Sequence, residues 1–275
     1  MIPYFLDDRR NASPRPAILV VIPYYNAAPW IDECLAKLRA NDEAHDILLI
    51  DDGSSPAFAI DGATDNLVIC RFAQNAGLIT ALNFAAGFAV SQGYTYYVRQ
   101  DADDMSRPTR LKSQLETIQR ENADLVVSGV RAVDQEGTTV WRGTMTTNGD
   151  LFRKTLATRN PTVHSTWFLR TDTFTKIGCY DERFKGAEDF ELLQRIARQG
   201  TIAFVPDELV DYLVRTGSVL SASRGPALQT LRILAYYFDG SNPRSYLGLF
   251  RATGAAMASR RLKTFARRFL QKPAS

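Results

Sequence analysis

The sequence predicts an α/β fold in which helices flank a mostly parallel sheet. Apolar runs of the length of a buried strand alternate with longer helical segments between residues 17 and 133, and acidic clusters follow two of these runs. The chain has 275 residues, of which 45% are apolar, so it can bury a sizeable core. This composition excludes a disordered, collagen-like or coiled-coil protein.

Each expected element follows from a local pattern. Five apolar runs that end in turn-forming residues are expected strands: Ala17–Ile22, Asp46–Ile50, Leu67–Phe72, Tyr94–Arg99 and Asp124–Val133. Helices are expected from Pro29 and Pro108, because proline suits a first helical turn, and over the largely apolar Leu78–Ser91. Further along, the patterns predict a strand over Thr162–Leu169, a helix over Asp189–Gln199 and a short strand over Thr201–Val205.

The expected compartment is the cytoplasm. No apolar run approaches the ~18 residues of a membrane-spanning helix, and the first residues lack the basic start and apolar stretch of a signal peptide. The three cysteines are scattered and odd in number, which fits a reducing compartment and offers no disulfide framework.

Polar residues gather where the expected strands end. The clusters are Pro23-Tyr24-Tyr25-Asn26, Asp51-Asp52-Gly53-Ser54 and Asp101-Ala102-Asp103-Asp104. Ligands of open α/β sheets bind beyond the carboxyl ends of the strands. Converging carboxylates repel each other unless a cation lies between them, and an Asp-x-Asp turn offers oxygen ligands for Mg²⁺ or Mn²⁺. An ordinary Asp-Gly turn is the alternative, but two acidic clusters at strand ends favour a ligand site.

Several familiar motifs are absent from the sequence. It contains no G-x-G-x-x-G after the first strand, no G-x-x-x-x-G-K-[ST], no H-E-x-x-H and no G-x-S-x-G. His45 and His164 are the two histidines of the chain, so a catalytic triad or a histidine-rich metal site has few candidate residues.

Seven segments in order resemble the family 2 glycosyltransferases over residues 17 to 223. They are Ile22-Pro23-Tyr24-Tyr25-Asn26, Ile50-Asp51-Asp52-Gly53-Ser54, Asn75-Ala76-Gly77 with Leu82-Asn83, Asp101-Ala102-Asp103-Asp104 with Pro108, Cys179-Tyr180-Asp181-Glu182, Glu188-Asp189-Phe190-Glu191-Leu192, and Tyr212-Leu213-Val214-Arg215 with Ser218 and Ser221. The Gln-x-x-Arg-Trp motif of processive synthases is missing, which indicates transfer of a single sugar.

The resemblance implies a GT-A fold, a nucleotide-sugar donor, a divalent metal and inversion at the anomeric carbon. By this resemblance Asp52 contacts the nucleotide base, Asp103 is the metal ligand with Asp101 beside it, and Asp189 is the catalytic base. The remaining residues expected to bind the donor are Pro23, Tyr24, Asn26, Asn75, Gly77 and Arg215.

The resemblance also suggests a division of the chain. A lead over residues 1–16 precedes a catalytic domain over 17–223, with a nucleotide-binding half (17–105) and an acceptor-binding half (106–223). A basic helical region over 224–275 follows.

The chemistry of an inverting transfer requires a base for the acceptor hydroxyl, and a carboxylate is a common choice. Asp189, at the start of an expected helix, is the first choice and Glu188 the second. A carboxylate that only stabilises the helix N-terminus is the alternative.

His164 and Trp167 are candidates for contacts with a sugar or the acceptor. The alternative for His164 is a buried structural histidine, and the alternative for Trp167 is packing in the core. For Arg215 the alternative to diphosphate binding is a surface arginine.

Charge is segregated along the chain. Residues 240–275 contain eight Lys or Arg and no acidic residue, whereas the first 239 residues carry 25 basic and 30 acidic groups. Within this tail Leu262, Phe265 and Phe269 recur at helical spacing among arginines, which predicts docking on an anionic membrane surface. A helix packed on the body is the alternative, and without a recognisable module we expect no nucleic-acid binding.

The function that fits these observations is metal-dependent transfer of one sugar, first from a UDP-sugar, to a lipid-linked or oligosaccharide acceptor during surface polysaccharide or lipopolysaccharide synthesis. A sugar-nucleotidyltransferase is the first alternative, although it would show a glycine-rich basic loop after the first strand. A non-catalytic scaffold with a decayed site is the second.

Overall fold

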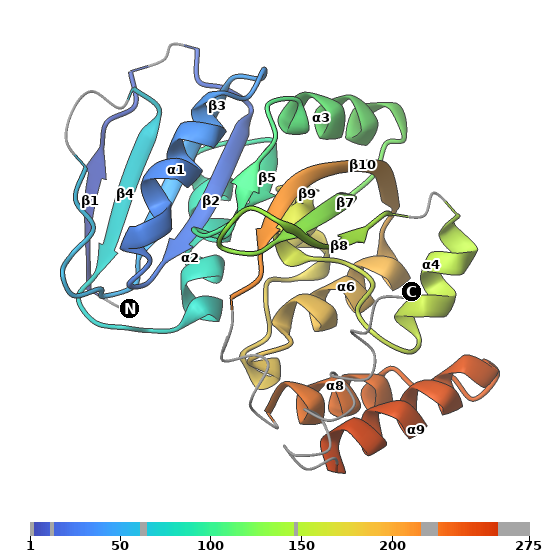
Figure 1. Cartoon of the computed structure of the whole chain (residues 1–275). Helices are drawn as coiled ribbons and strands as arrows, with labels where there is room; N and C mark the ends of the chain where they lie inside the picture. The colour runs from blue at the N-terminus through green and yellow to red at the C-terminus, as the bar shows by residue number, and fades with distance from the viewer. Residues whose placement is uncertain (1–2, 12–13, 61–64, 146–147, 216–224, 258–275) are drawn as a thin grey trace.

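A central mixed sheet with helices on both faces forms the body of the protein in a computed structural model (Figure 1). The structure describes residues 3–11, 14–60, 65–145, 148–215 and 225–257. The strands are β1 (Tyr4–Asp8), β2 (Ile18–Tyr24), β3 (His45–Asp51), β4 (Leu67–Phe72), β5 (Tyr96–Arg99), β6 (Met105–Ser106), β7 (Leu125–Val133), β8 (Thr139–Gly143), β9 (Trp167–Arg170) and β10 (Ile202–Leu213).

The sheet order is β1-β4-β3-β2-β5-β9-β7-β10-β6, with β8 attached to β7. Strands β4, β3, β2 and β5 run parallel, and β10 runs parallel to β7. In contrast, β9 is antiparallel to both of its neighbours, and β1, β6 and β8 are antiparallel additions. The α/β class is confirmed, and the expected parallel pairing is concentrated in the first half of the chain, where short runs alternate with helices.

Helices cover the two faces of the sheet with separate apolar clusters. On one face lie α1 (Ala28–Arg39) and α3 (Arg110–Arg120). The other face is covered by α2 (Leu78–Ser91), α4 (Gly149–Leu156), α5 (Asp172–Ile177) and α6 (Glu188–Gln199). Ile31, Leu35 and Leu38 form the buried stripe of α1, as their spacing predicts.

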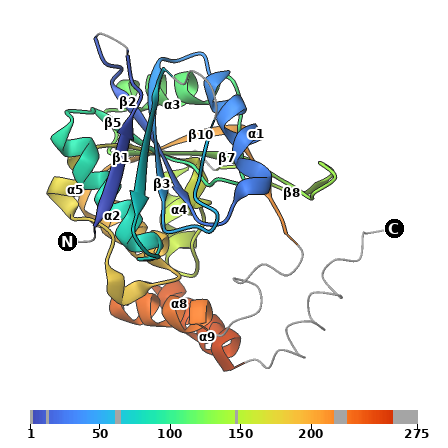
Figure 2. The ribbon, with the colours of Figure 1, turned by 90° about the vertical axis from the view of Figure 1, so that its left-hand side faces the viewer.

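The last described helices form a hairpin that packs on α6. Helices α8 (Gly225–Tyr236) and α9 (Pro243–Met257) lie against each other at the lower end of the molecule, away from β1–β4 (Figures 1 and 2). Ile233 and Leu234 of α8 and Ala252 of α9 join the larger apolar cluster, so the hairpin shares the core of the body. Among the described residues, no helix has the length and apolar character needed to cross a bilayer.

Three segments differ from the expected elements. The strand expected over Thr162–Leu169 is a 3₁₀ turn, η1 (His164–Thr166), followed by β9, because the hydroxyl of Thr166 bonds the Val163 carbonyl and curls the chain. The short strand from Thr201 extends to Leu213 as β10, since a bulge opposite Gly129 carries it past Pro206. Residues 4–8, within the expected lead, pair with β4 as an edge strand.

Candidate active site

A cavity of about 780 Å³ opens where β5 and the loop after β4 end and helices α2 and α6 begin. It brings together five residues that the sequence singled out, namely Gly77, Asp101, His164, Glu188 and Asp189. These residues span 112 positions of the chain, from Gly77 to Asp189. The cavity therefore lies at the carboxyl edge of the parallel strands, where the sequence predicts a ligand site.

The Asp-Asp-Gly-Ser turn positions one wall of this cavity. Asp52 is buried, and its carboxylate accepts hydrogen bonds from the backbone N–H groups of Ala76 (2.6 Å) and Gly77 (2.9 Å). A side chain at Gly53 could not fit, because its Cβ would lie 2.6 Å from the backbone of Asn75 and the residue has a φ of +72°. The turn after β3 thus fixes the start of α2.

Asn26 joins the loops after β2 and β3. Its side-chain oxygen accepts a hydrogen bond from the Ser55 N–H at 3.0 Å, and its own N–H donates to the Ser54 hydroxyl. Pro23 is half-buried, and the Tyr24 ring is buried against Phe58. Tyr24 therefore supports these loops from inside the core. The donor contact expected for Tyr24 would require an exposed side chain, which this position does not offer.

The carboxylates of the Asp-Ala-Asp-Asp turn are either paired with arginines or fully buried. Asp101 pairs with the buried Arg99 at 2.5 Å, and Asp103 pairs with Arg215 at 2.7 Å. Asp104 is fully buried and accepts a hydrogen bond from the Leu213 N–H at 3.0 Å, which ties the turn to the end of β10. Asp101 and Asp103 thus keep partly exposed carboxylates, whereas the carboxylate of Asp104 is committed to the fold.

Asp103 lies in an electrostatic setting that favours a cation. Burial and the charge of Asp101 both raise the pKa of Asp103, and Arg215 opposes them. The Arg215 guanidinium also lies 4.7 Å from the centre of the Trp30 ring, which holds it beside the turn. Among the described residues, no group of three or more His, Cys, Asp or Glu side chains could hold a metal. Asp101 and Asp103 fit an ion that takes its other oxygen ligands from substrate phosphates and water.

Asp189 enters the cavity from the first turn of α6. Its Oδ2 accepts a hydrogen bond from the Asn160 side-chain amide at 2.8 Å, and its Oδ1 accepts one from the Phe190 N–H at 2.7 Å. Burial, together with the neighbouring charge of Glu188, raises the pKa of Asp189 to about 7. Glu188 also lines the cavity, but its carboxylate caps the Gly186 N–H at 2.7 Å.

His164 lines the cavity with its imidazole ring. Burial and the nearby positive charge of Arg99 hold the pKa of His164 well below its usual range. Its Nε2 lies 2.9 Å from the Tyr180 hydroxyl, and its ring meets the edge of Trp167. Trp167 itself has no exposed surface and donates to the Thr162 hydroxyl at 3.0 Å. The sugar contact suggested for Trp167 is therefore corrected to core packing.

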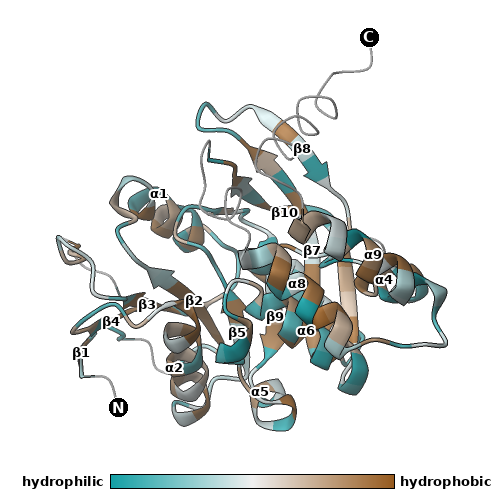
Figure 3. Cartoon of the chain, turned by 90° about the horizontal axis from the view of Figure 1, so that it is seen from below, coloured by the Kyte–Doolittle hydropathy of each residue, from teal (hydrophilic) through white to brown (hydrophobic). Residues whose placement is uncertain are grey.

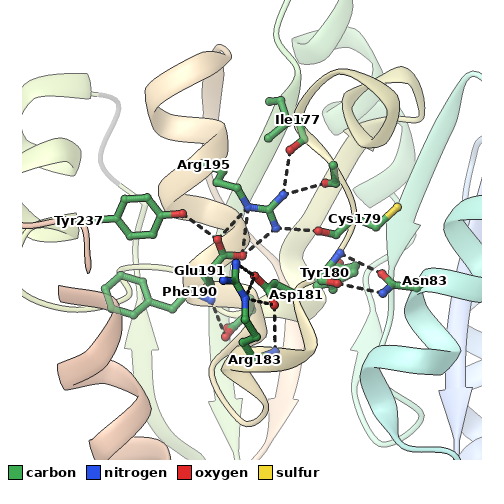
Figure 4. A network of polar contacts seen from close by, with 12 residues as sticks. Asn83, Ile177, Cys179, Tyr180, Asp181, Arg183, Phe190, Glu191, Arg195 and Tyr237 are labelled. Carbon is green, nitrogen blue, oxygen red and sulfur yellow. Dashed lines mark hydrogen bonds and ion pairs between the residues drawn. The ribbon is translucent and has the colours of Figure 1, made fainter. Parts of the chain in front are cut away.

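The loop that carries Tyr180 is clamped from two sides (Figure 4). Asn83 of α2 exchanges two hydrogen bonds of 2.9 Å with the Tyr180 backbone. From α6, Arg195 donates to the carbonyl oxygens of Ile177 (2.9 Å) and Cys179 (2.7 Å). Arg195 also pairs with the buried Glu191, which accepts a hydrogen bond from Tyr237 beyond α8. The clamp joins α2, the cavity wall and the C-terminal hairpin.

Several cavity residues were not among the expected site residues. Arg99, Trp141 and Lys185 line the cavity, as does Tyr212 of the quoted Tyr212–Arg215 segment, and Arg99 and Lys185 add positive charge to it. Lys185 follows the 3₁₀ turn η2 (Glu182–Phe184) and stands across from Gly77, 3.9 Å from the place of a Cβ there. In the sequence, Lys185 is marked as a possible site residue only by its position just before Glu188-Asp189. Pro23, Asn26, Asp52, Asn75, Asp103 and Arg215 lie outside the lining of this cavity.

Solved structures with the same architecture are GT-A glycosyltransferases. Residues 1–349 of S. aureus TarS in complex with UDP-GlcNAc superpose with a TM-score of 0.65 at 18% identity, covering 91% of this chain and 75% of that one. The mannosyltransferase PcManGT from Pyrobaculum calidifontis, in complex with GDP-Man and Mn²⁺, gives 0.60 at 19% identity, covering 95% and 82%. The fold is therefore GT-A.

The chain belongs to glycosyl transferase family 2, whose sequence model matches residues 19–177. A glycosyltransferase of Rickettsia typhi, itself uncharacterized, is 26% identical over 209 residues, and the match spans 71% of this chain and 63% of that protein's length. The O-antigen biosynthesis glycosyltransferase WbnJ of Escherichia coli is 29% identical over 122 residues, covering 44% of this chain and 47% of WbnJ. The succinoglycan biosynthesis protein ExoU of Rhizobium meliloti is 33% identical over 122 residues, covering 42% and 34%.

Proposed function

We propose that the protein is an inverting glycosyltransferase that moves one sugar from a nucleoside diphosphate sugar, first a UDP-sugar, to a hydroxyl group of an oligosaccharide or lipid-linked acceptor. The observation that carries the proposal is that Asp189 and Asp101, a base and one half of an Asp-x-Asp pair, share one cavity. The relatives named for O-antigen and succinoglycan biosynthesis support a role in surface polysaccharide synthesis.

Inversion requires a single displacement. The acceptor oxygen attacks the anomeric carbon, the bond to the diphosphate oxygen breaks with its electron pair, and Asp189 takes the proton of the acceptor hydroxyl. Asn160 and the Phe190 N–H orient the carboxylate and leave it lone pairs for that proton. A pKa of about 7 makes Asp189 a stronger base than an exposed aspartate while it remains largely ionised just above neutrality.

Positive side chains surround the expected place of the leaving diphosphate. Arg215 is held beside Asp103, Arg99 beside Asp101, and Lys185 opposite Gly77. Asp103 and Asp101 would hold Mn²⁺ or Mg²⁺, which would supply Lewis-acid stabilisation of the negative charge on the leaving group. Arg215 lies beside Asp103 and would bind a phosphate oxygen through its planar guanidinium.

Peripheral association with an anionic membrane surface, on the cytoplasmic side, is a further part of the proposal. Helix α9 exposes Tyr246, Leu247, Phe250 and Met257, and Arg244 and Arg251 lie along the border of this face. Its opposite face carries the buried residues Ser245, Gly248, Ala252 and Ala256. Apolar side chains flanked by arginines suit a helix that lies in the plane of the headgroups. The basic residues 258–275 lie outside the described part of the chain.

A donor screen tests the transfer. The full chain is incubated with UDP- and GDP-sugars, with Mn²⁺ or with EDTA, and nucleoside diphosphate and pyrophosphate are measured separately. We expect nucleoside diphosphate release that EDTA abolishes and Mn²⁺ or Mg²⁺ restores. Asp103→Asn should lose this metal-dependent release but keep its fold. Pyrophosphate release would instead identify a sugar-nucleotidyltransferase, and undiminished release by Asp103→Asn in EDTA would contradict the metal site.

A further inference from the structure

Trp141 is a large exposed aromatic residue on the rim of the cavity. It lies on β8, whose one strand partner among the described residues is β7, and it is 42% exposed while lining the same cavity as Asp101 and Asp189. Exposure of an indole ring to water is unfavourable by the hydrophobic effect, and Trp141 belongs to neither apolar core cluster of the described residues. Its position therefore calls for a ligand-based explanation.

The strand register places Trp141 beside Tyr212. Ala132 of β7 is the direct partner of Trp141 on one side and of Tyr212 on the other. Residues in one such row project from the same face of the sheet, so the two rings converge above the small Ala132 side chain. Their centroids lie 6.3 Å apart with the planes tilted by 44°, and Ala132 is fully covered.

Gly143 leaves room for the indole. It lies two residues beyond Trp141 on β8 and therefore on the same face of the strand. A Cβ at Gly143 would lie 2.8 Å from Cζ3 of Trp141 and 2.9 Å from Cγ1 of Val130. Any side chain there would push the ring from its present position, so the hairpin is shaped around Trp141.

We propose that Trp141, supported by Tyr212, is a platform on which the ring of a pyranose stacks. A pyranose has an apolar C–H face, which packs on an aromatic ring, and a rim of hydroxyl groups. Polar partners for such hydroxyls line the same cavity in His164, Glu182 and Lys185. The proposal rests on the function proposed above and adds the subsite for a sugar ring, which belongs either to the donor or to the acceptor.

Two kinds of measurement test the platform on the full chain. The first compares dissociation constants for UDP-GlcNAc with UDP and for GDP-mannose with GDP, and KM values for methyl glycoside acceptors. The variants are Trp141→Ala, Trp141→Phe as the conservative rescue, and Gly143→Ala, which displaces the ring without removing it. Val140→Ala, also exposed on β8, is the matched control. The second measures the change of tryptophan fluorescence on addition of the same sugars and of methyl β-D-glucopyranoside, which needs no turnover.

We expect Trp141→Ala and Gly143→Ala to weaken binding of one sugar ring by about 3- to 10-fold, with Trp141→Phe close to wild type. A loss confined to the sugar nucleotide identifies the donor ring, and a loss confined to KM of the glycoside identifies the acceptor ring. Equal losses for UDP and UDP-GlcNAc, or no loss beyond that of Val140→Ala, would overturn the platform. If no donor is turned over, the proposed function fails, but the fluorescence measurement still tests the platform. A sugar-induced change that is lost in Trp141→Phe supports stacking on Trp141, and a change that persists in Trp141→Phe contradicts it.

Discussion

Asp189→Asn keeps the shape of the side chain and removes its capacity to take a proton. We expect the nucleotide-sugar dissociation constant to remain within about twofold, because the substitution preserves the size and shape of the side chain. Turnover should fall by at least about 100-fold, the usual weight of a general base. The measurement is single-turnover transfer with saturating donor. A rate near wild type for Asp189→Asn, together with an inactive Glu188→Gln, would move the base to Glu188.

The pH dependence of kcat/KM reports the same residue. The pKa of Asp189 is raised to about 7, so the base form dominates above this pH and the rate should fall about tenfold per unit below it. Glu188→Gln removes a negative neighbour, which lowers the pKa of Asp189 and should shift the rising limb toward lower pH. If the rising limb of the wild-type pH profile had its midpoint near pH 4, the pKa of Asp189 would not be raised in the working enzyme.

The sequence predicts the chemistry of single residues better than their exposure. Asp101 reaches the cavity because it follows the parallel strand β5, whereas Asp189 reaches it from the first turn of α6. Tyr24 and Trp167 carry side chains that suit a binding wall, but both are buried, and burial depends on packing partners distant in the chain. Trp141 belongs to no motif, and only the register of β8 against β7 places it at the cavity.

At the scale of one element, α6 is the helix on which the cavity and the hairpin both depend. Arg195→Ala would leave the carboxylate of Glu191 buried and without its cation, which costs about 3–5 kcal/mol of unfolding free energy. The matched control in the same network is Arg183→Ala, whose ion pair with Asp181 is exposed to solvent and contributes little to stability (Figure 4). Urea unfolding measures both variants. Equal losses would contradict a buried network.

Elements with a strong apolar pattern have nearly the bounds that the sequence predicts. The strand Leu67–Phe72 and the helix Leu78–Ser91 have the expected bounds. Strands β1 and β8 and helix α4 were missed, because each has few buried residues and owes its position to a neighbouring strand or helix. Local propensity carries little information about such peripheral elements.

On the scale of the whole molecule, the hairpin of α8 and α9 carries several of the exposed large apolar side chains. Brown, apolar segments are visible on α8 and α9 when the molecule is seen from below (Figure 3). Truncation at Gly240 would remove buried Ser245 and Ala252, so point changes are the better probe of membrane binding.

We therefore expect the double variant Phe250→Ser, Met257→Ser to lose at least about tenfold in affinity for anionic vesicles, since both side chains are 77% exposed on α9. Raising the salt concentration should weaken the wild type as well, because arginines near the surface are screened. Val90→Ser, an exposed change on α2, is the control. Co-sedimentation with anionic and neutral vesicles measures the effect, and equal sedimentation of all variants would remove the membrane from the proposal.

Strand β1 bears on how the protein behaves at high concentration. It exposes Tyr4 and Phe5 along one outer edge of the sheet, where another chain could add a strand. The same strand ends in Asp7 and Asp8, which pair with Arg9 and Arg10 and place a row of charges at that edge. An incoming strand would have to bury these ion pairs, which is costly. We therefore expect the acidic end of β1 to disfavour edge-to-edge aggregation of the protein at high concentration.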